Sequence, residues 1–199
     1  MSAAAAHADH HGPPVANQSS RVNAATLGML LFIASEIMVF GSFFTAYFFI
    51  RIVNNSAWPP HGDELPKFVA GVNTAILVTS SFTMHWATQA IKRNNRAGLC
   101  AGMVLTLALG LCFLLTQARE YSRIGFAPHD NAFGTVFYGL TGLHGAHVMV
   151  GLTLLTMVTI RSFRGHFSAE HHHGVEIPGI YWHFVDVMWI VVYATVYIL

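Results

Sequence analysis

The sequence predicts an all-α integral membrane protein with five transmembrane helices. Of its 199 residues, 54% are hydrophobic and only 10% are Asp, Glu, Lys or Arg, whereas soluble domains carry roughly 25% charged residues. The apolar residues form five segments, each long enough to cross a hydrocarbon core of about 30 Å at about 1.5 Å per helical residue. Short polar joints separate the segments. These observations indicate one helical domain at residues 21–199, which follows a tail at residues 1–20.

The first apolar segment, at about 24–50, contains a single ionisable residue, Glu36, near its middle. An ionisable side chain at this depth is costly, and it is rarely kept unless it faces other helices. Glu36 is therefore the first candidate for a functional residue.

The second and third segments, at about 68–91 and 97–118, are joined by the basic sequence Lys92-Arg93-Asn94-Asn95-Arg96. Short loops rich in Lys and Arg stay on the cytoplasmic side of a membrane. This joint therefore predicts that the N-terminus lies inside and the C-terminus outside. The second segment also carries His85, toward its inner end.

The fourth segment, at about 133–160, carries His144 and His147 near its middle. Because residues three apart are neighbours on a helix surface, we expect both imidazoles on one face. They lie at a depth similar to that of Glu36. We therefore predict a hydrogen-bonded cluster of these three side chains, in which each member lowers the cost of burying the others.

The fifth segment, at about 177–199, places His183 and Asp186 on one face, about one turn inside the membrane. We count both, with His85, as further polar groups within the membrane. Aromatic side chains are enriched where helices meet the membrane surface. The residues expected to anchor the helices there and to contact lipid are Trp58, Trp182, Trp189 and Tyr193.

Three functions could explain the buried polar cluster. Histidines could bind haem or a metal, but no second helix offers a pair that matches His144 and His147 in depth. A proton or ion path through Glu36 would need a water-filled lining, and the helices offer few hydroxyl groups at depth. The third interpretation is structural: the cluster holds helices together and shapes a lipid-facing cleft. The residue types alone do not separate the second interpretation from the third, although the physics favours the third.

Two histidine-rich stretches lie outside the predicted helices. The tail at residues 1–20 is rich in Ala and His and lacks the basic and apolar regions of a signal peptide, so we expect a retained, disordered segment. A second stretch, His171, His172 and His173, precedes the last helix. It could buffer protons at the cytoplasmic side, or it could be a solvated turn.

Four sequence strings, in this order and spacing, resemble subunit III of haem-copper terminal oxidases, and the resemblance covers nearly the whole chain after the tail. Its five-helix length is similar to the short bacterial form. The strings are Ser35-Glu36-Ile37-Met38-Val39-Phe40, Gln117-Ala118-Arg119-Glu120-Tyr121, Gly142-Leu143-His144-Gly145-Ala146-His147-Val148, and Tyr181-Trp182-His183-Phe184-Val185-Asp186-Val187-Met188-Trp189.

The resemblance implies a subunit of a proton-pumping oxidase that reduces O₂ to water. In that family the haems and copper belong to subunits I and II, so we expect no catalytic, cofactor-binding or metal-ligating residue in this chain. Subunit III packs against subunit I, binds phospholipids in a cleft, and supports proton uptake and resistance to inactivation. By position, Glu36 resembles the family's carbodiimide-reactive carboxylate, and His144 resembles its polar partner.

Within the family, the strings are more similar to the cytochrome c oxidase branch than to the bo-type quinol oxidases, which remain the alternative. A free-standing transporter or membrane scaffold is a further alternative, but the discontinuous helices or internal repeat of many transporters are not seen. The expected location is a bacterial inner membrane, with subunits I and II and phospholipids as partners. A net charge of +1 gives no reason to expect nucleic acid.

Overall fold

The computed structural model describes residues 23–54, 58–60, 65–169 and 172–199, and these residues contain helices but no strand. The predicted all-α fold is confirmed, and each predicted segment coincides with one helix that extends up to four residues beyond it. The predicted tail at residues 1–20 and His171 lie outside the described residues. The helices are α1 (Ala24–Val53), α2 (Lys67–Lys92), α3 (Arg96–Tyr121), α4 (Ala132–Phe163) and α5 (His173–Tyr193), and α5 continues as a π-helical turn, η2 (Ala194–Ile198).

Asparagine side chains fix the start of three helices. The side chains of Asn23, Asn95 and Asn131 accept hydrogen bonds from backbone N–H groups in the first turns of α1, α3 and α4, at 3.0, 2.9 and 2.6 Å. Such caps satisfy backbone donors that have no partner within the helix. The polar joints between apolar segments therefore determine where these helices begin.

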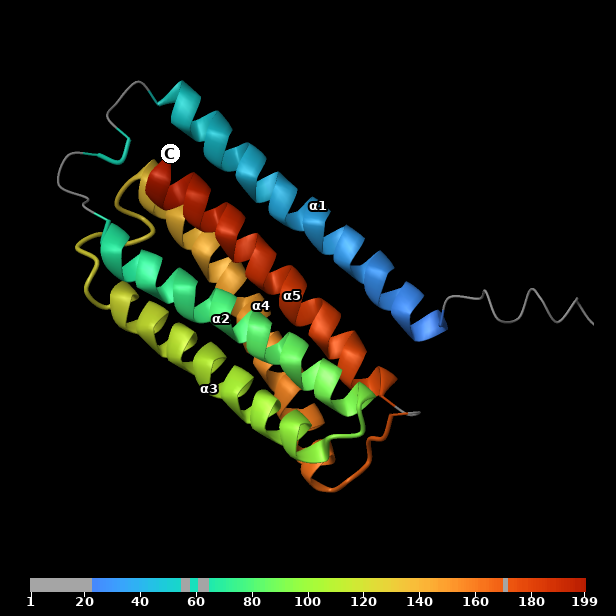
Figure 1. Ribbon diagram of the computed structural model, residues 1–199. Coiled ribbons are helices and arrows are strands. Elements are labelled where there is room, and N and C mark those ends of the chain that lie inside the picture. The colour runs from blue at the N-terminus through green and yellow to red at the C-terminus, as the bar shows by residue number, and fades with distance from the viewer. Residues whose placement is uncertain (1–22, 55–57, 61–64, 170–171) are drawn as a thin grey trace, which may run out of the picture.

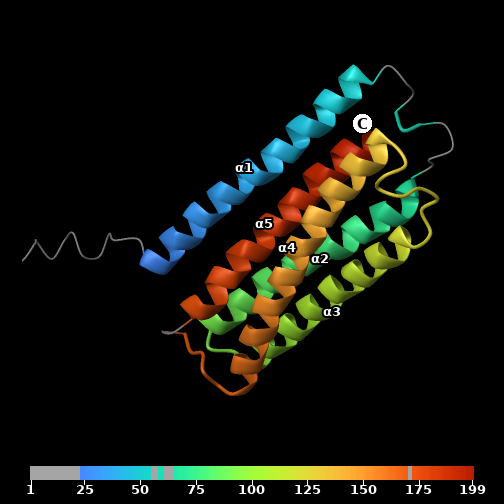
Figure 2. The ribbon, with the colours of Figure 1, turned by 180° about the vertical axis from the view of Figure 1, so that it is seen from behind.

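Helices α2, α3, α4 and α5 pack together as a bundle, and α1 lies along the outside of this bundle (Figures 1 and 2). Its contacts are with α4 and α5. In the most apolar part of α1 only 6% of the residues are buried, compared with 61% for α5 with η2. Helix α5 is therefore central in the molecule, whereas α1 presents most of its surface to the surroundings.

Small residues bring α2 and α3 into close contact. A Cβ atom added to Gly98 would lie 2.9 Å from the Cβ of Ala90, and one added to Gly102 would lie 2.7 Å from the Cβ of Ala87. Larger side chains would therefore separate the helices. This is the close backbone approach through which helices associate in lipid.

The indole of Trp182 fills the centre of the bundle. It is fully buried, and its Nε1 donates a hydrogen bond of 3.0 Å to the Oγ of Ser80 on α2. Its ring lies against two positions that lack a side chain, Gly110 on α3 and Gly151 on α4. One α5 side chain thus contacts all three other helices of the bundle.

The structure corrects the expected interfacial position of Trp182 and Trp189. Both are fully buried, and Nε1 of Trp189 donates to the Oγ1 of Thr74 at 3.0 Å. The reason is the central position of α5, which leaves its aromatic residues among protein neighbours. Trp58 and Tyr193 are half-buried, and Trp58 packs edge-on against Phe133.

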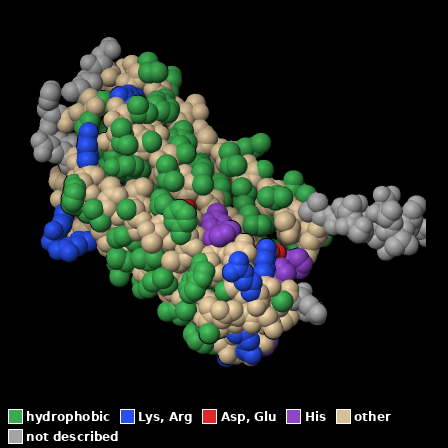
Figure 3. Space-filling view, viewed as in Figure 1, with side chains coloured by type: hydrophobic (Ala, Val, Ile, Leu, Met, Phe, Trp, Pro, Cys, Tyr) green, Lys and Arg blue, Asp and Glu red, His purple; other side chains and the backbone are tan. Residues whose placement is uncertain are grey.

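Four helices of the described chain are long and apolar enough to cross a membrane: α1, α3, α4, and α5 with η2. Helix α2 is not among them, although it is as long as α3. It carries Asn73, Thr74 and a polar run from Thr79 to Ser81, which lower its overall hydrophobicity. Hydrophobic side chains cover the middle of the molecule, and Lys and Arg gather toward its two ends (Figure 3).

Candidate functional site

The candidate site is a pair of side chains that joins α1 to α4. The Oε2 of Glu36 lies 2.8 Å from the Nε2 of His147. The two side chains are 17% and 13% exposed, respectively. The pair connects residues 111 positions apart in the chain, and it joins the outer helix to the bundle.

Three further contacts involve His147, two through its imidazole and one through its backbone carbonyl. Its Nδ1 lies 2.8 Å from the backbone carbonyl oxygen of Leu143, one turn earlier on α4. The ring of Phe40 packs against it with centroids 4.9 Å apart. On the α5 side, the hydroxyl of Tyr181 donates to the backbone carbonyl of His147 at 3.3 Å.

These contacts determine which atoms of the Glu36–His147 pair donate hydrogen bonds and which accept them. A carbonyl oxygen only accepts hydrogen bonds, so Nδ1 of His147 must be the donor to Leu143. The hydrogen bond to Glu36 then contains one shared proton. Either a neutral carboxyl donates to a neutral imidazole, or an imidazolium donates to a carboxylate. Both nitrogens of His147 are therefore engaged, Nδ1 by the carbonyl of Leu143 and Nε2 by the carboxyl group of Glu36.

His144 does not join this pair, so the predicted cluster of all three side chains does not form, and the expectation that His144 is the polar partner of Glu36 is wrong. Three residues advance a helix by about 300°, which leaves the two histidine side chains about 60° apart. This difference directs His147 toward α1 and His144 into the bundle. The imidazole of His144 is fully buried between Phe113 and Trp189, at centroid distances of 5.8 and 4.8 Å, and neither nitrogen has a hydrogen-bond partner among the described residues.

A separate polar group lies between α2 and α5. The Oγ of Ser81 is 2.8 Å from the Nδ1 of His183. Asp186 is 3% exposed, and neither of its carboxylate oxygens has a hydrogen-bond partner among the described residues. His85 is exposed on the surface of α2. The structure does not bring these residues to the Glu36–His147 pair.

Sequence reasoning missed a third polar feature, at the end of α3. Gln117 and Glu120 are buried, and their side-chain polar atoms have no hydrogen-bond partner within the described residues. Nearby, the hydroxyl of Tyr121 donates to the Oγ1 of Thr141 at 2.7 Å. The sequence did contain a signal for this feature: Gln117 and Glu120 are three residues apart, so both lie on one face of an otherwise apolar helix.

No group of three or more His, Cys, Asp or Glu side chains that could hold a metal ion is found in the part of the chain that the structure describes. The histidines at membrane depth contact a carboxylate, a hydroxyl or aromatic rings. The contacts of these histidines are therefore hydrogen bonds and packing against aromatic rings.

Comparisons with known proteins agree with one another. The model of the family described as cytochrome c oxidase subunit III matches residues 5–199. A protein named cytochrome c oxidase subunit 3 from Thermostichus vulcanus is 43% identical over 174 residues, which cover 87% of this chain and 86% of that protein. The protein of that name from a Synechocystis strain is 43% identical over 192 residues, covering 96% and 78%. The human protein of that name is 38% identical over 194 residues, covering 94% and 72%.

Proposed function

Because this chain belongs to the cytochrome c oxidase subunit III family, we propose that it is the non-catalytic subunit III of an aerobic respiratory cytochrome c oxidase. Such a complex transfers electrons to O₂ and couples this transfer to proton pumping. The observation that carries the proposal is the match of the family model over nearly the whole chain. The names of the relatives favour cytochrome c as the electron donor over a quinol.

In this proposal the chain holds no redox centre, and the haems and copper belong to subunits I and II. The surroundings of its histidines support this assignment. Both nitrogens of His147 are engaged by other groups of the chain, and His144 lies between two aromatic rings. The role of the chain is then to support subunit I, including proton uptake into it.

The Glu36–His147 pair is proposed to hold α1 against α4 and so to shape a lipid-filled cleft. Helix α1 has few other polar contacts with the bundle, and it exposes large apolar side chains such as Leu31, Met38 and Phe49. These side chains suit acyl chains or a partner helix. A hydrogen bond at this position fixes the angle of α1 without requiring a large packed interface.

All five helices are proposed to cross a bacterial inner membrane, as one domain at residues 21–199. Helix α2 is 26 residues long, like α3, and packs against it through small residues. Its polar residues Asn73 and Ser80 are buried in the bundle, so they do not prevent α2 from spanning. The basic joint at residues 92–96 supports an N-terminus inside and a C-terminus outside.

Purification tests this function directly. The tagged chain should co-purify with haem-bearing subunits, and the complex should oxidise reduced cytochrome c with consumption of O₂. The isolated chain should show no haem spectrum. Purification of the chain without any haem-bearing partner would contradict the proposal, and turnover with a quinol but not with cytochrome c would assign it to the quinol branch.

A second measurement separates a structural role of Glu36 from a direct role in proton transfer. Glu36→Gln keeps a hydrogen-bonding side chain of the same size but cannot release a proton. The structural role predicts nearly unchanged initial O₂ reduction in the assembled complex. Loss of this initial activity would instead assign Glu36 to the path of the protons.

A further inference from the structure

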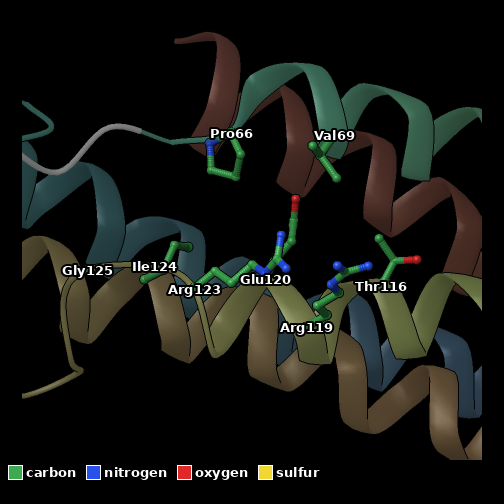
Figure 4. A pocket seen from close by; sticks show the side chains of 8 residues that line it. All are labelled: Pro66, Val69, Thr116, Arg119, Glu120, Arg123, Ile124 and Gly125. Carbon is green, nitrogen blue, oxygen red and sulfur yellow. The ribbon is translucent and has the colours of Figure 1, made fainter.

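A cavity of about 390 Å³ opens between the beginning of α2 and the end of α3. Figure 4 shows the side chains that line it. Its apolar walls include Pro66, Val69 and Ile124, and its charged groups are Arg119, Glu120 and Arg123.

The position of this cavity along α3 places it at the edge of the hydrocarbon core. Residues 97–118 contain no charged side chain and span about 33 Å at about 1.5 Å per residue. This length matches a hydrocarbon core of about 30 Å. Arg119, Glu120 and Arg123, which follow directly, therefore lie at the level of the lipid headgroups.

The two arginines suit a phosphate group. Arg119 and Arg123 are four residues apart and thus neighbours on the surface of the chain where α3 ends. Both are exposed, and no ion pair within the described residues includes either one. Paired guanidinium groups bind phosphate through several charge-assisted hydrogen bonds.

The same cavity contains a buried acceptor that none of the described residues satisfies. Glu120 is 6% exposed, and neither carboxylate oxygen has a hydrogen-bond partner among the residues described. Its side chain extends from α3 toward α2, between Pro66 and Val69 (Figure 4). A buried carboxylate is costly unless a donor or a cation satisfies it.

We propose that this cavity binds the headgroup of a phospholipid that carries both a phosphate and a primary ammonium, as phosphatidylethanolamine does. Arg119 and Arg123 bind the phosphate, Glu120 accepts hydrogen bonds from the ammonium, and the acyl chains extend along the apolar surface of α2 and α3. The site lies on the opposite side of the bundle from α1 (Figure 1). It is therefore distinct from the cleft proposed beside the Glu36–His147 pair.

The test uses the purified oxidase complex in nanodiscs that contain equal amounts of phosphatidylethanolamine, phosphatidylcholine and phosphatidylglycerol. After transfer to detergent, native mass spectrometry counts the lipids that remain on this subunit. We expect the wild-type chain to retain phosphatidylethanolamine preferentially. Phosphatidylcholine has no N–H donor for Glu120, and phosphatidylglycerol has no cation.

The variants separate the two halves of the site. Glu120→Gln should lower the preference for phosphatidylethanolamine about tenfold, since a hydrogen bond to a charged group contributes enough for that ratio. The double variant Arg119→Gln, Arg123→Gln should reduce retention of all three lipids. Arg164→Gln, an exposed arginine at the other end of the bundle, should retain lipid as the wild type does.

Other outcomes would overturn the proposal. These are equal retention of the three lipids by the wild type, unchanged retention in both cavity variants, or complete displacement of lipid by inorganic phosphate. In Arg123→Cys, cross-linking of the new thiol mainly to another polypeptide would assign the cavity to a partner subunit instead. The double arginine variant changes only exposed side chains, so it keeps the test decisive if Glu120→Gln fails to assemble.

Discussion

The packing of Trp182 against two glycines gives a quantitative prediction about the bundle. In Gly151→Ala, the new Cβ would lie 2.8 Å from Cε3 of Trp182 and 3.0 Å from Cζ3. Carbon atoms normally pack at about 3.5–4.0 Å, so the indole would have to move by roughly 0.5 Å or more. The same ring also packs closely against Gly110, where an added Cβ would lie 2.7 Å from Cη2, so the indole has little free space around it.

Overpacking of this kind costs about 1–3 kcal/mol. We therefore expect Gly151→Ala to lower the temperature at which the chain dissociates from the detergent-solubilised complex, as measured by loss of the subunit from a size-exclusion peak after heating. Gly145→Ala is the matched control on the same helix, since its added Cβ meets no atom within 4 Å. Equal dissociation temperatures for the two variants would refute the proposed packing of Trp182.

Three other variants probe separate contacts. Trp58→Phe should lower the stability of the chain by about 1 kcal/mol, because it keeps an aromatic ring but removes the hydrogen bond of 3.0 Å from the indole to the hydroxyl of Tyr47 on α1. Trp86→Phe, on an exposed side chain, should have no effect in the same heating assay. Asp186→Leu should raise the dissociation temperature, because it removes buried carboxylate oxygens that have no hydrogen-bond partner among the described residues. A fall in this temperature would reveal a partner such as ordered water. Lys92→Gln should lower the stability of the chain by less than about 1 kcal/mol, because the 2.7 Å ion pair of Lys92 with Glu176 is partly exposed. A larger loss of stability that does not change with salt concentration would contradict this.

The sequence was sufficient to locate the helices. Apolar length and polar joints predicted all five, and the asparagine caps explain why three of them begin where they do. The helices extend past the apolar segments because charged residues that follow these segments, such as Arg51 and Arg161, still form the last helical turns.

The contacts of individual side chains could not be predicted in the same way. Depth along a helix can be read from the sequence, but the angle around the helix matters only once its neighbours are known. The side chains of His144 and His147 differ by about 60° in direction around α4, and this difference determines that His147, and not His144, meets Glu36. Trp182 and Trp189 were misplaced for the same reason, since nothing in the sequence of α5 alone shows that α5 is the central helix.

The most direct test of the central claim is a double-mutant cycle between Glu36 and His147 in the assembled complex. Glu36→Leu, His147→Leu and the double variant are compared for the free energy of unfolding of the chain, because this hydrogen bond lies within one chain and breaks when α1 separates from the bundle. A hydrogen bond that holds α1 to α4 predicts a coupling energy of about 0.6 kcal/mol, the average found between membrane helices, and of up to about 1.7 kcal/mol, the maximum. A parallel cycle between Glu36 and His144 should be additive to within about 0.5 kcal/mol. Additivity in the His147 cycle, or coupling only in the His144 cycle, would contradict the account.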